Sequence, residues 1–163
     1  EAVLAQLDGI KAAHARLADP RGLDRAERDR LVRDTPPVYW LLGAIHSPET
    51  GSPEMLMELA YRLAVDEGEY AHAIRANVVT LITPVQEVDG RDRIVDLYEQ
   101  AQRLKVGQAG MNLVYWGKYT AHDNNRDGMV LSQQITRNCL RGFLDWRPIV
   151  THDLHESVPF LYT

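Results

Sequence analysis

The residues best suited to chemistry lie in three short polar clusters, at positions 46–49, 89–91 and 152–156. Each cluster stands near the place where we expect a strand of an α/β sheet to end. In open α/β sheets, ligands bind beyond the carboxyl ends of the strands. The sequence therefore predicts one crevice on which the three clusters converge.

The first and third clusters contain a possible metal site. His46 and Glu49 are three residues apart at a predicted strand-to-helix turn, so both can point to one side, and His155 adds a second imidazole from a distant strand. Two nearby ligands and one remote ligand are typical of catalytic zinc, which keeps its fourth position open for water. The pKa of such a water falls to about 7, which yields a hydroxide able to attack a carbonyl group.

Each part of this pattern also has a simpler interpretation. An H-x-x-E pair is frequent by chance, and His155 could cap a strand or bond a backbone carbonyl. His152 is the alternative third ligand. Because side chains alternate along a strand, His152 and His155 should face opposite sides, so an unbent strand offers only one of them to the metal.

The elements that must position these residues follow from periodicity and turn signals. The apolar run 38–45 predicts a strand buried on both faces, and residues 77–83 and 149–155 predict two more. Strands that alternate with helices predict an α/β fold with a mixed, largely parallel central sheet flanked by helices. The predicted helices cover residues 3–17, 25–33 (with Asp24 and Glu27 as a capping box), 52–65 (with Ser52 as N-cap), 94–104 and 132–146; residues 84–90 and 121–128 read as loops, and 111–119 as strand or loop.

Composition limits the class of protein. The 163 residues are 45% hydrophobic and 25% charged, which is typical of one globular domain. No apolar run approaches the roughly 18 residues that a membrane span needs. The net charge is −5 and no basic stripe exists, so nucleic acid is not an expected partner.

The single cysteine, Cys139, excludes an internal disulfide and a cysteine-based metal site, and we expect it to be an inert residue inside its helix. Any metal must therefore be held by histidine, aspartate or glutamate. His14 and His72 lie in helical patterns without partners, and we expect them at the surface or capped by local bonds.

Three strings occur together in a family order: 43–51 (GAIHSPETG), 123–127 (DNNRD) and 153–156 (DLHE). Together they resemble the zinc carboxypeptidases of the M14 type, over roughly residue 38 to the end. The resemblance implies a zinc carboxypeptidase-like fold, incomplete at both ends, with residues 1–163 as a partial catalytic domain. Residues 1–36 would be its helical N-terminal part and 37–163 its ligand-bearing α/β part. It also implies Zn²⁺ bound by His46, Glu49 and His155.

The resemblance further implies hydrolysis of C-terminal peptide bonds, with a peptide or protein C-terminus as the substrate and metal-bound water as the attacking group. Asn125 and Arg126 would bind the terminal carboxylate of the substrate. Arginine offers a planar fork of donors that matches a carboxylate, which selects chain ends over internal bonds.

Two departures from the family pattern stand out. Typical members carry an arginine that polarises the scissile carbonyl, whereas the corresponding stretch here, 115–118, reads Tyr-Trp-Gly-Lys. Lys118 is our candidate for this electrophile, with Arg91 or Arg93 as alternatives.

The second departure concerns the catalytic glutamate, which the family carries on a strand well downstream of the third ligand. The sequence ends eight residues after His155. Glu156 should point to the other side of its strand, so we assign no general base to these residues. Without one, we expect no appreciable peptidase activity from residues 1–163 alone; if activity were found, Glu156 and Glu87 would be the first residues to test.

The loop 123–128 has a competing interpretation. Asp123, Asn125, Asp127 and Gly128 match the first half of an EF-hand calcium loop, but position twelve is Gln134 instead of the bidentate glutamate. A solvated turn rich in Asp and Asn is the structural alternative.

Two other functions remain open at this point. One is an aspartoacylase-like amidohydrolase, which shares H-x-x-E and a distant histidine but acts on small N-acyl amino acids. The other is a non-catalytic relative that binds peptide ends or metal. The sequence leaves the oligomeric state and the compartment open, and only the family resemblance suggests a secreted or periplasmic protein.

Overall fold

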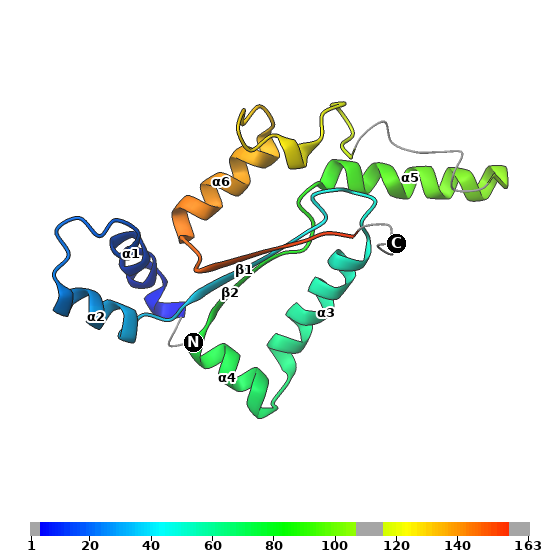
Figure 1. The fold of residues 1–163 in the computed structure, drawn as a ribbon. Coiled ribbons are helices and arrows are strands. Elements are labelled where there is room, and N and C mark those ends of the chain that lie inside the picture. The colour runs from blue at the N-terminus through cyan, green and yellow to red at the C-terminus, as the bar shows by residue number, and fades with distance from the viewer. Residues whose placement is uncertain (1–3, 107–115, 157–163) are drawn as a thin grey trace, which may run out of the picture.

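The computed structural model describes residues 4–106 and 116–156, and a small parallel sheet forms its centre (Figure 1). The strands are β1 (Val38–Gly43), β2 (Val79–Thr83) and β3 (Val150–Leu154), in the spatial order β2-β1-β3. Both pairings are parallel, with Val38 opposite Val79 and Tyr39 opposite Val150. The α/β class and the three predicted strands are therefore confirmed, and the carboxyl ends of all three strands meet at one edge.

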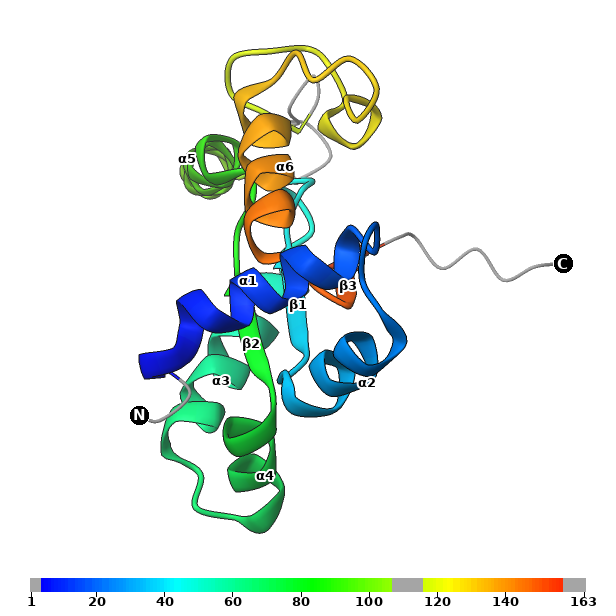
Figure 2. The same cartoon turned by 90° about the vertical axis from the view of Figure 1, so that its left-hand side faces the viewer.

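Helices lie on both faces of this sheet, as Figures 1 and 2 show from two sides. Helices α3 and α4 lie on one face and α6 on the other, where α1 packs against it. Helix α5 extends away from the carboxyl end of β2. The helix bounds are α1 Leu7–Ala18, α2 Arg25–Asp34, α3 Gly51–Val65, α4 Glu69–Asn77, α5 Val88–Leu104 and α6 Gln134–Trp146, with short 3₁₀ turns at Leu4–Gln6 and Asn124–Arg126.

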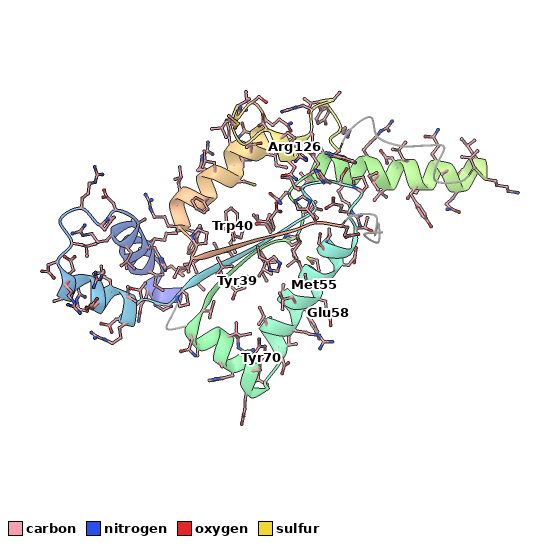
Figure 3. The ribbon with its side chains drawn as sticks, in the orientation of Figure 1. Tyr39, Trp40, Met55, Glu58, Tyr70 and Arg126 are labelled. Carbon is pink, nitrogen blue, oxygen red and sulfur yellow. The ribbon has the colours of Figure 1, made fainter. Side chains whose placement is uncertain are left out.

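The central strand is apolar on both faces because helices cover both. Tyr39 and Trp40 point to opposite sides of β1, with Trp40 between the sheet and α6 (Figure 3). The indole Nε1–H of Trp40 donates to Thr83 Oγ1 at 3.0 Å, which joins β1 to β2. At the other end of the strand, Val38 packs with Ile10 and Val79 in the core. These contacts hold the strand on both faces and so position the turn that follows its carboxyl end.

Local sequence patterns predicted the start of α2 correctly but not the cap of α3. The N-cap half of the predicted capping box is confirmed, because the Asp24 carboxylate accepts from the Glu27 backbone N–H at 2.8 Å. The Glu27 side chain instead lies 3.5 Å from Arg16 on α1. Ser52 is not the N-cap of α3, which begins at Gly51; its hydroxyl instead accepts from the Ala44 N–H at 3.3 Å. Long-range contact with the end of β1 therefore replaces the expected local cap.

Three further expectations were wrong. Residue 77 belongs to the short helix α4, which the sequence analysis did not place, instead of to β2. Helix α5 begins at residue 88, six residues earlier than predicted, because the Glu87 carboxylate accepts from the Gly90 N–H and caps it. The spacing of residues 135, 139, 140 and 143 also predicts an inward apolar face for helix α6, but Leu140 and Phe143 are 37% and 43% exposed, because the described residues include nothing that covers this part of the helix.

His14 also differs from expectation. It is 4% exposed, and its Nε2 lies 3.0 Å from the Pro36 carbonyl oxygen. The histidine is buried because α1 packs over the segment that leads into β1. Residues 111–115 of the stretch predicted as strand or loop lie outside the described residues, and residues 116–119 form bends.

Candidate metal centre

The turn after β1 carries His46, and several contacts define its shape. Ala44 has a φ of 48° and is fully buried, a left-handed conformation that costs energy outside glycine and often occurs at functional sites. The Asn124 side-chain amide donates to the Ile45 carbonyl, and the Ser47 hydroxyl donates to the Trp116 carbonyl. The turn is thus held from both sides by residues far along the chain.

His46, Glu49 and His155 meet beyond the carboxyl ends of β1 and β3. His46 Nδ1 lies 2.8 Å from Glu49 Oε1, and His155 Nδ1 lies 3.2 Å from Glu49 Oε2. The candidate ligand atoms of the three residues all lie within 4.8 Å of one another. His46 and Glu49 are each 12% exposed and His155 is 33% exposed, so the cluster is largely shielded from solvent on the side of β1.

The outer nitrogens of both imidazoles face aspartates. His46 Nε2 lies 3.2 Å from Asp123 Oδ1, and His155 Nε2 lies 3.0 Å from Asp153 Oδ2. An ionised carboxylate can only accept hydrogen bonds, so each Nε2 must carry the proton. In neutral imidazole the Nδ1 then has a lone pair, and both Nδ1 lone pairs face the Glu49 carboxylate.

This arrangement fits a bound cation. Two lone pairs and a carboxylate repel one another unless positive charge, supplied by a bound cation or by a proton on an imidazole, lies between them. Glu49 Oε2 is also buried, and although His155 Nδ1 lies 3.2 Å away, the described residues give this oxygen no hydrogen bond, which is costly for a carboxylate oxygen. Two imidazole nitrogens and one carboxylate form a donor set that zinc uses in catalytic sites, and imidazoles bonded to carboxylates are the usual surroundings of such ligands.

Asp123 joins the loop before α6 to the cluster. Its Oδ1 also accepts from the Asn125 backbone N–H at 2.9 Å. Burial alone would raise the pKa of Asp123, but the hydrogen bonds from Asn125 and His46 outweigh it and hold the pKa below its usual value. Asp123 is therefore ionised and keeps the His46 proton on Nε2.

Comparison with known proteins gives this cluster its context. A sequence model of the Peptidase M14 family, the zinc carboxypeptidases, matches residues 20–141, which is most of the chain. The chain belongs to this family. The searches of curated proteins and of solved structures found no match. Among the helices of the described residues, none combines the length and apolar composition needed to cross a membrane.

The family match includes His46, Glu49, Asn125 and Arg126, whereas His155 lies beyond it. The geometry therefore supplies separate evidence for His155, since β3 places its imidazole beside Glu49. His152 lies elsewhere: its Nδ1 is 3.0 Å from the Tyr39 hydroxyl, on the other face of β3. The structure thus brings His155, and not the alternative third ligand, to the cluster.

The candidate substrate-binding residues lie on the 3₁₀ turn that follows Asp123. Asn125 and Arg126 are both exposed, and Arg126 Nη1 donates to the Asn125 carbonyl at 3.1 Å. Figure 3 shows Arg126 on the loop between α5 and α6. Because Asp123 on the same turn contacts His46, this loop attaches the arginine to the edge of the cluster.

The candidate electrophiles have other contacts. Lys118 is exposed, and its Nζ lies 5.6 Å from the centre of the Tyr119 ring. Arg91 Nη2 lies 3.4 Å from Glu54 Oε1, which joins α5 to α3, and Arg93 pairs with Asp96 at 3.9 Å. The described geometry places none of these cations in the His46–Glu49–His155 cluster.

The calcium interpretation of the loop 123–128 loses support. Asp127 is fully buried, and its oxygens accept from the Ser132 hydroxyl and from the backbone N–H groups of Ser132 and Gln133. Burial alone would raise the pKa of Asp127, but these bonds hold it far below its usual value. Asp123 and Asp127 therefore bind separate donors, and Asp127 serves to fold the loop onto the start of α6.

Sequence reasoning missed three supporting residues. Asp123 and Asp153 contact the two imidazoles, and Glu156 Oε1 accepts from the Gly51 and Ser52 backbone N–H groups at the start of α3. A carboxylate at the N-terminus of a helix is favourable, so Glu156 ties the residue after His155 to the helix after Glu49. For Asp153 a signal existed, since residues two apart on a strand share a face.

Proposed function

We propose that the protein is a zinc-dependent carboxypeptidase that hydrolyses the C-terminal bond of peptides, with zinc bound by His46, Glu49 and His155. Membership of the zinc carboxypeptidase family supports the reaction class. The observation that carries the assignment of ligands is the pair of imidazoles whose Nδ1 atoms face the Glu49 carboxylate while aspartates hold their Nε2 atoms.

Zinc bound at such a centre supplies an activated water and polarises a carbonyl group. The residues of the chain contribute the rest. His46 and His155 provide neutral nitrogen ligands in a fixed tautomer, and Glu49 provides the negative charge that partly balances the ion. Three protein ligands leave a coordination position for the reactants, as in other catalytic zinc sites.

Arg126 would determine which peptide bond is hydrolysed, by binding the terminal carboxylate of the substrate. Its guanidinium can form two parallel hydrogen bonds with a carboxylate, and Asn125 adds a further donor. Because both residues follow Asp123, which contacts His46, a terminal carboxylate bound there would lie a fixed span from the metal centre. Lys118 is the proposed cation for the developing oxyanion, although a lysine acts as a point charge and lacks the fork of an arginine.

The test compares peptide substrates that differ only at the C-terminus. When zinc-loaded, a protein that includes the strand-borne glutamate used as general base in the family should hydrolyse free-acid peptides and should lose most of this activity on their C-terminal amides. Residues 1–163 alone, to which we assign no general base, should show no appreciable turnover of either substrate. Arg126→Lys should lower kcat/KM for free-acid peptides by about 10- to 100-fold, because a bidentate contact worth roughly 1.5–3 kcal/mol is lost, while zinc content stays unchanged. The exposed Lys105→Arg serves as a matched control.

Equal rates on free-acid and amidated peptides would contradict the role of Arg126. Hydrolysis of N-acetyl amino acids in preference to peptides would identify an amidohydrolase instead. Zinc binding without turnover of either substrate class, in a protein that includes the family's glutamate, would identify a binding relative. Retention of zinc by both His46→Ala and His155→Ala would exclude the proposed centre itself.

A further inference from the structure

His155 is held by a side chain of its own strand. Asp153 and His155 are two residues apart, so strand alternation turns both to the same side, and the Asp153 carboxylate lies 3.0 Å from His155 Nε2. His155 itself follows the last residue of β3, at an edge of the described sheet, and a third of its side chain is exposed. Neither burial nor a tight turn fixes this ring.

Asp153 is in turn held by Gln86, which lies in the loop after β2 and also contacts α6. Its Oδ1 accepts from the Gln86 side-chain amide at 3.3 Å, and Gln86 Oε1 accepts from the Cys139 thiol at 3.0 Å. The Gln86 backbone N–H donates to the Gly43 carbonyl at 2.9 Å, which fixes Gln86 beside the end of β1. Burial, and then the charge of Asp153, raise the pKa of the Cys139 thiol, so it stays protonated and donates.

These bonds determine which nitrogen of His155 faces Glu49. A histidine on an edge strand can rotate about its side-chain bonds and can carry its proton on either nitrogen. With Asp153 accepting from Nε2–H, only Nδ1 offers a lone pair to the cluster. Gln86 donates to one oxygen of Asp153 and leaves the other for His155.

We propose that Asp153 is a positioning residue of the metal centre, which fixes the tautomer and orientation of His155, and that Gln86 and Cys139 hold Asp153 in place. This inference rests on the proposed zinc centre. Carboxylates that accept from a metal-bound histidine typically contribute about 10- to 100-fold to metal affinity. Asp153 therefore should matter for zinc binding although it does not touch the metal.

The experiment measures zinc affinity by competition with a chromophoric chelator. Asp153→Leu removes the acceptor, and we expect it to weaken zinc binding by about 10- to 100-fold. Asp153→Asn keeps an acceptor oxygen in a side chain of nearly the same shape, so it should lose less. Asp145→Asn is the matched control, since Asp145 pairs with Lys11 near the far end of the sheet and its loss should leave zinc affinity unchanged.

A spectroscopic readout separates positioning from general destabilisation. In ¹⁵N-labelled, metal-free protein, where no metal on Nδ1 can set the tautomer, long-range ¹H–¹⁵N couplings should show the His155 proton on Nε2 in the wild type and a changed Nε2–H signal in Asp153→Asn. Gln86→Leu should shift the same signal and weaken zinc binding by a smaller factor than Asp153→Leu. A melting temperature measured for each variant shows whether it is folded.

The His155→Ala variant distinguishes a failure of the proposed role of Asp153 from a failure of the proposed zinc centre. If His155→Ala loses zinc while Asp153→Leu and Asp153→Asn keep wild-type affinity and an unchanged His155 signal, the role of Asp153 is wrong and the zinc centre stands. If His155→Ala also keeps its zinc, the zinc centre is wrong at this ligand. Should Asp153→Leu fail to fold, Asp153→Asn carries the test with the same two readouts.

Discussion

His46 and His155 reach the same cluster from parts of the molecule that are built differently. His46 lies in a turn that leaves the central strand, is 12% exposed, and is flanked by Ile45 and Ser47, which bond to residues of distant segments. His155 follows an edge strand and is 33% exposed. It is flanked by two carboxylates: Asp153, which contacts its ring, and Glu156, which bonds the start of α3.

The difference shows two ways to fix a ligand. A turn packed into the core holds its side chain by many backbone contacts. We therefore expect it to tolerate the loss of a single side-chain contact but not the addition of a group that would clash with the surrounding residues. An edge strand offers fewer contacts, so single side chains carry more of the positioning. The variants below use this contrast, from the largest expected effect to the smallest.

Loss of a candidate ligand should have the largest effect on zinc binding. The effect should be the same for a ligand in the turn after β1 as for His155 after β3. Glu49→Ala and His155→Ala are each expected to lose zinc on dialysis, because each leaves only two protein ligands. His152→Ala is the matched control, because His152 bonds Tyr39 on the other face of β3. Metal analysis of the purified variants is the measurement. Zinc lost from His152→Ala but kept by His155→Ala would reverse the choice of the third ligand.

A steric change should affect the turn of His46 strongly. A Cβ added at Gly90 would lie 2.1 Å from the Trp116 carbonyl oxygen and 2.9 Å from Ser47 Oγ, both of which belong to the packing around this turn. Overpacking of this kind typically costs about 1–3 kcal/mol. Gly90→Ala should therefore lower the free energy of unfolding by about that amount and should weaken zinc binding as well.

Gly9→Ala is the matched comparison for Gly90→Ala, because the same substitution should raise the stability of the protein at this position. Gly9 is in α1, and its added Cβ would meet nothing within 4 Å. Alanine in a helix is favoured over glycine by about 0.5–1 kcal/mol, so this variant should be slightly more stable. Thermal unfolding followed by circular dichroism measures both. Equal melting temperatures for the two variants would mean that Gly90 is not tightly packed.

The contrast also explains what the sequence could predict. The apolar run of β1, the H-x-x-E turn and the Asp24 cap are local patterns, and the structure has all of them. Helix α4 was missed because its signals are weak and the strand after it was extended back to residue 77. The early start of α5 depends on Glu87, whose capping role cannot be distinguished in sequence from that of any other loop carboxylate.

The candidate metal ligands could be named from the sequence because they are residue types with family spacing, whereas the residues that contact them could not. Asp123 lies 77 positions from His46, and only the folded loop before α6 brings them to 3.2 Å. Likewise Glu156 and the start of α3 are 105 positions apart. Contacts of this kind follow from the assembled sheet and not from any local pattern, which is why the supporting residues are evident only in three dimensions.

The smallest expected effect concerns Glu156, which joins the two parts directly. Its carboxylate accepts from two N–H groups at the start of α3, in the manner of a helix cap, and such caps contribute about 0.5–2 kcal/mol. Glu156→Ala should lower the free energy of unfolding by about 1 kcal/mol and should weaken zinc binding by only a few-fold, because Asp153 still holds His155. Glu67→Ala, at an exposed position, is the control. Denaturant unfolding and the chelator competition measure the two effects.

A second variant tests Glu156 as a general base. Glu156→Gln keeps an acceptor for the helix but removes the charge that a general base would need. If Glu156→Gln abolished peptide turnover while stability and zinc content were unchanged, Glu156 would be a catalytic base and not a structural link.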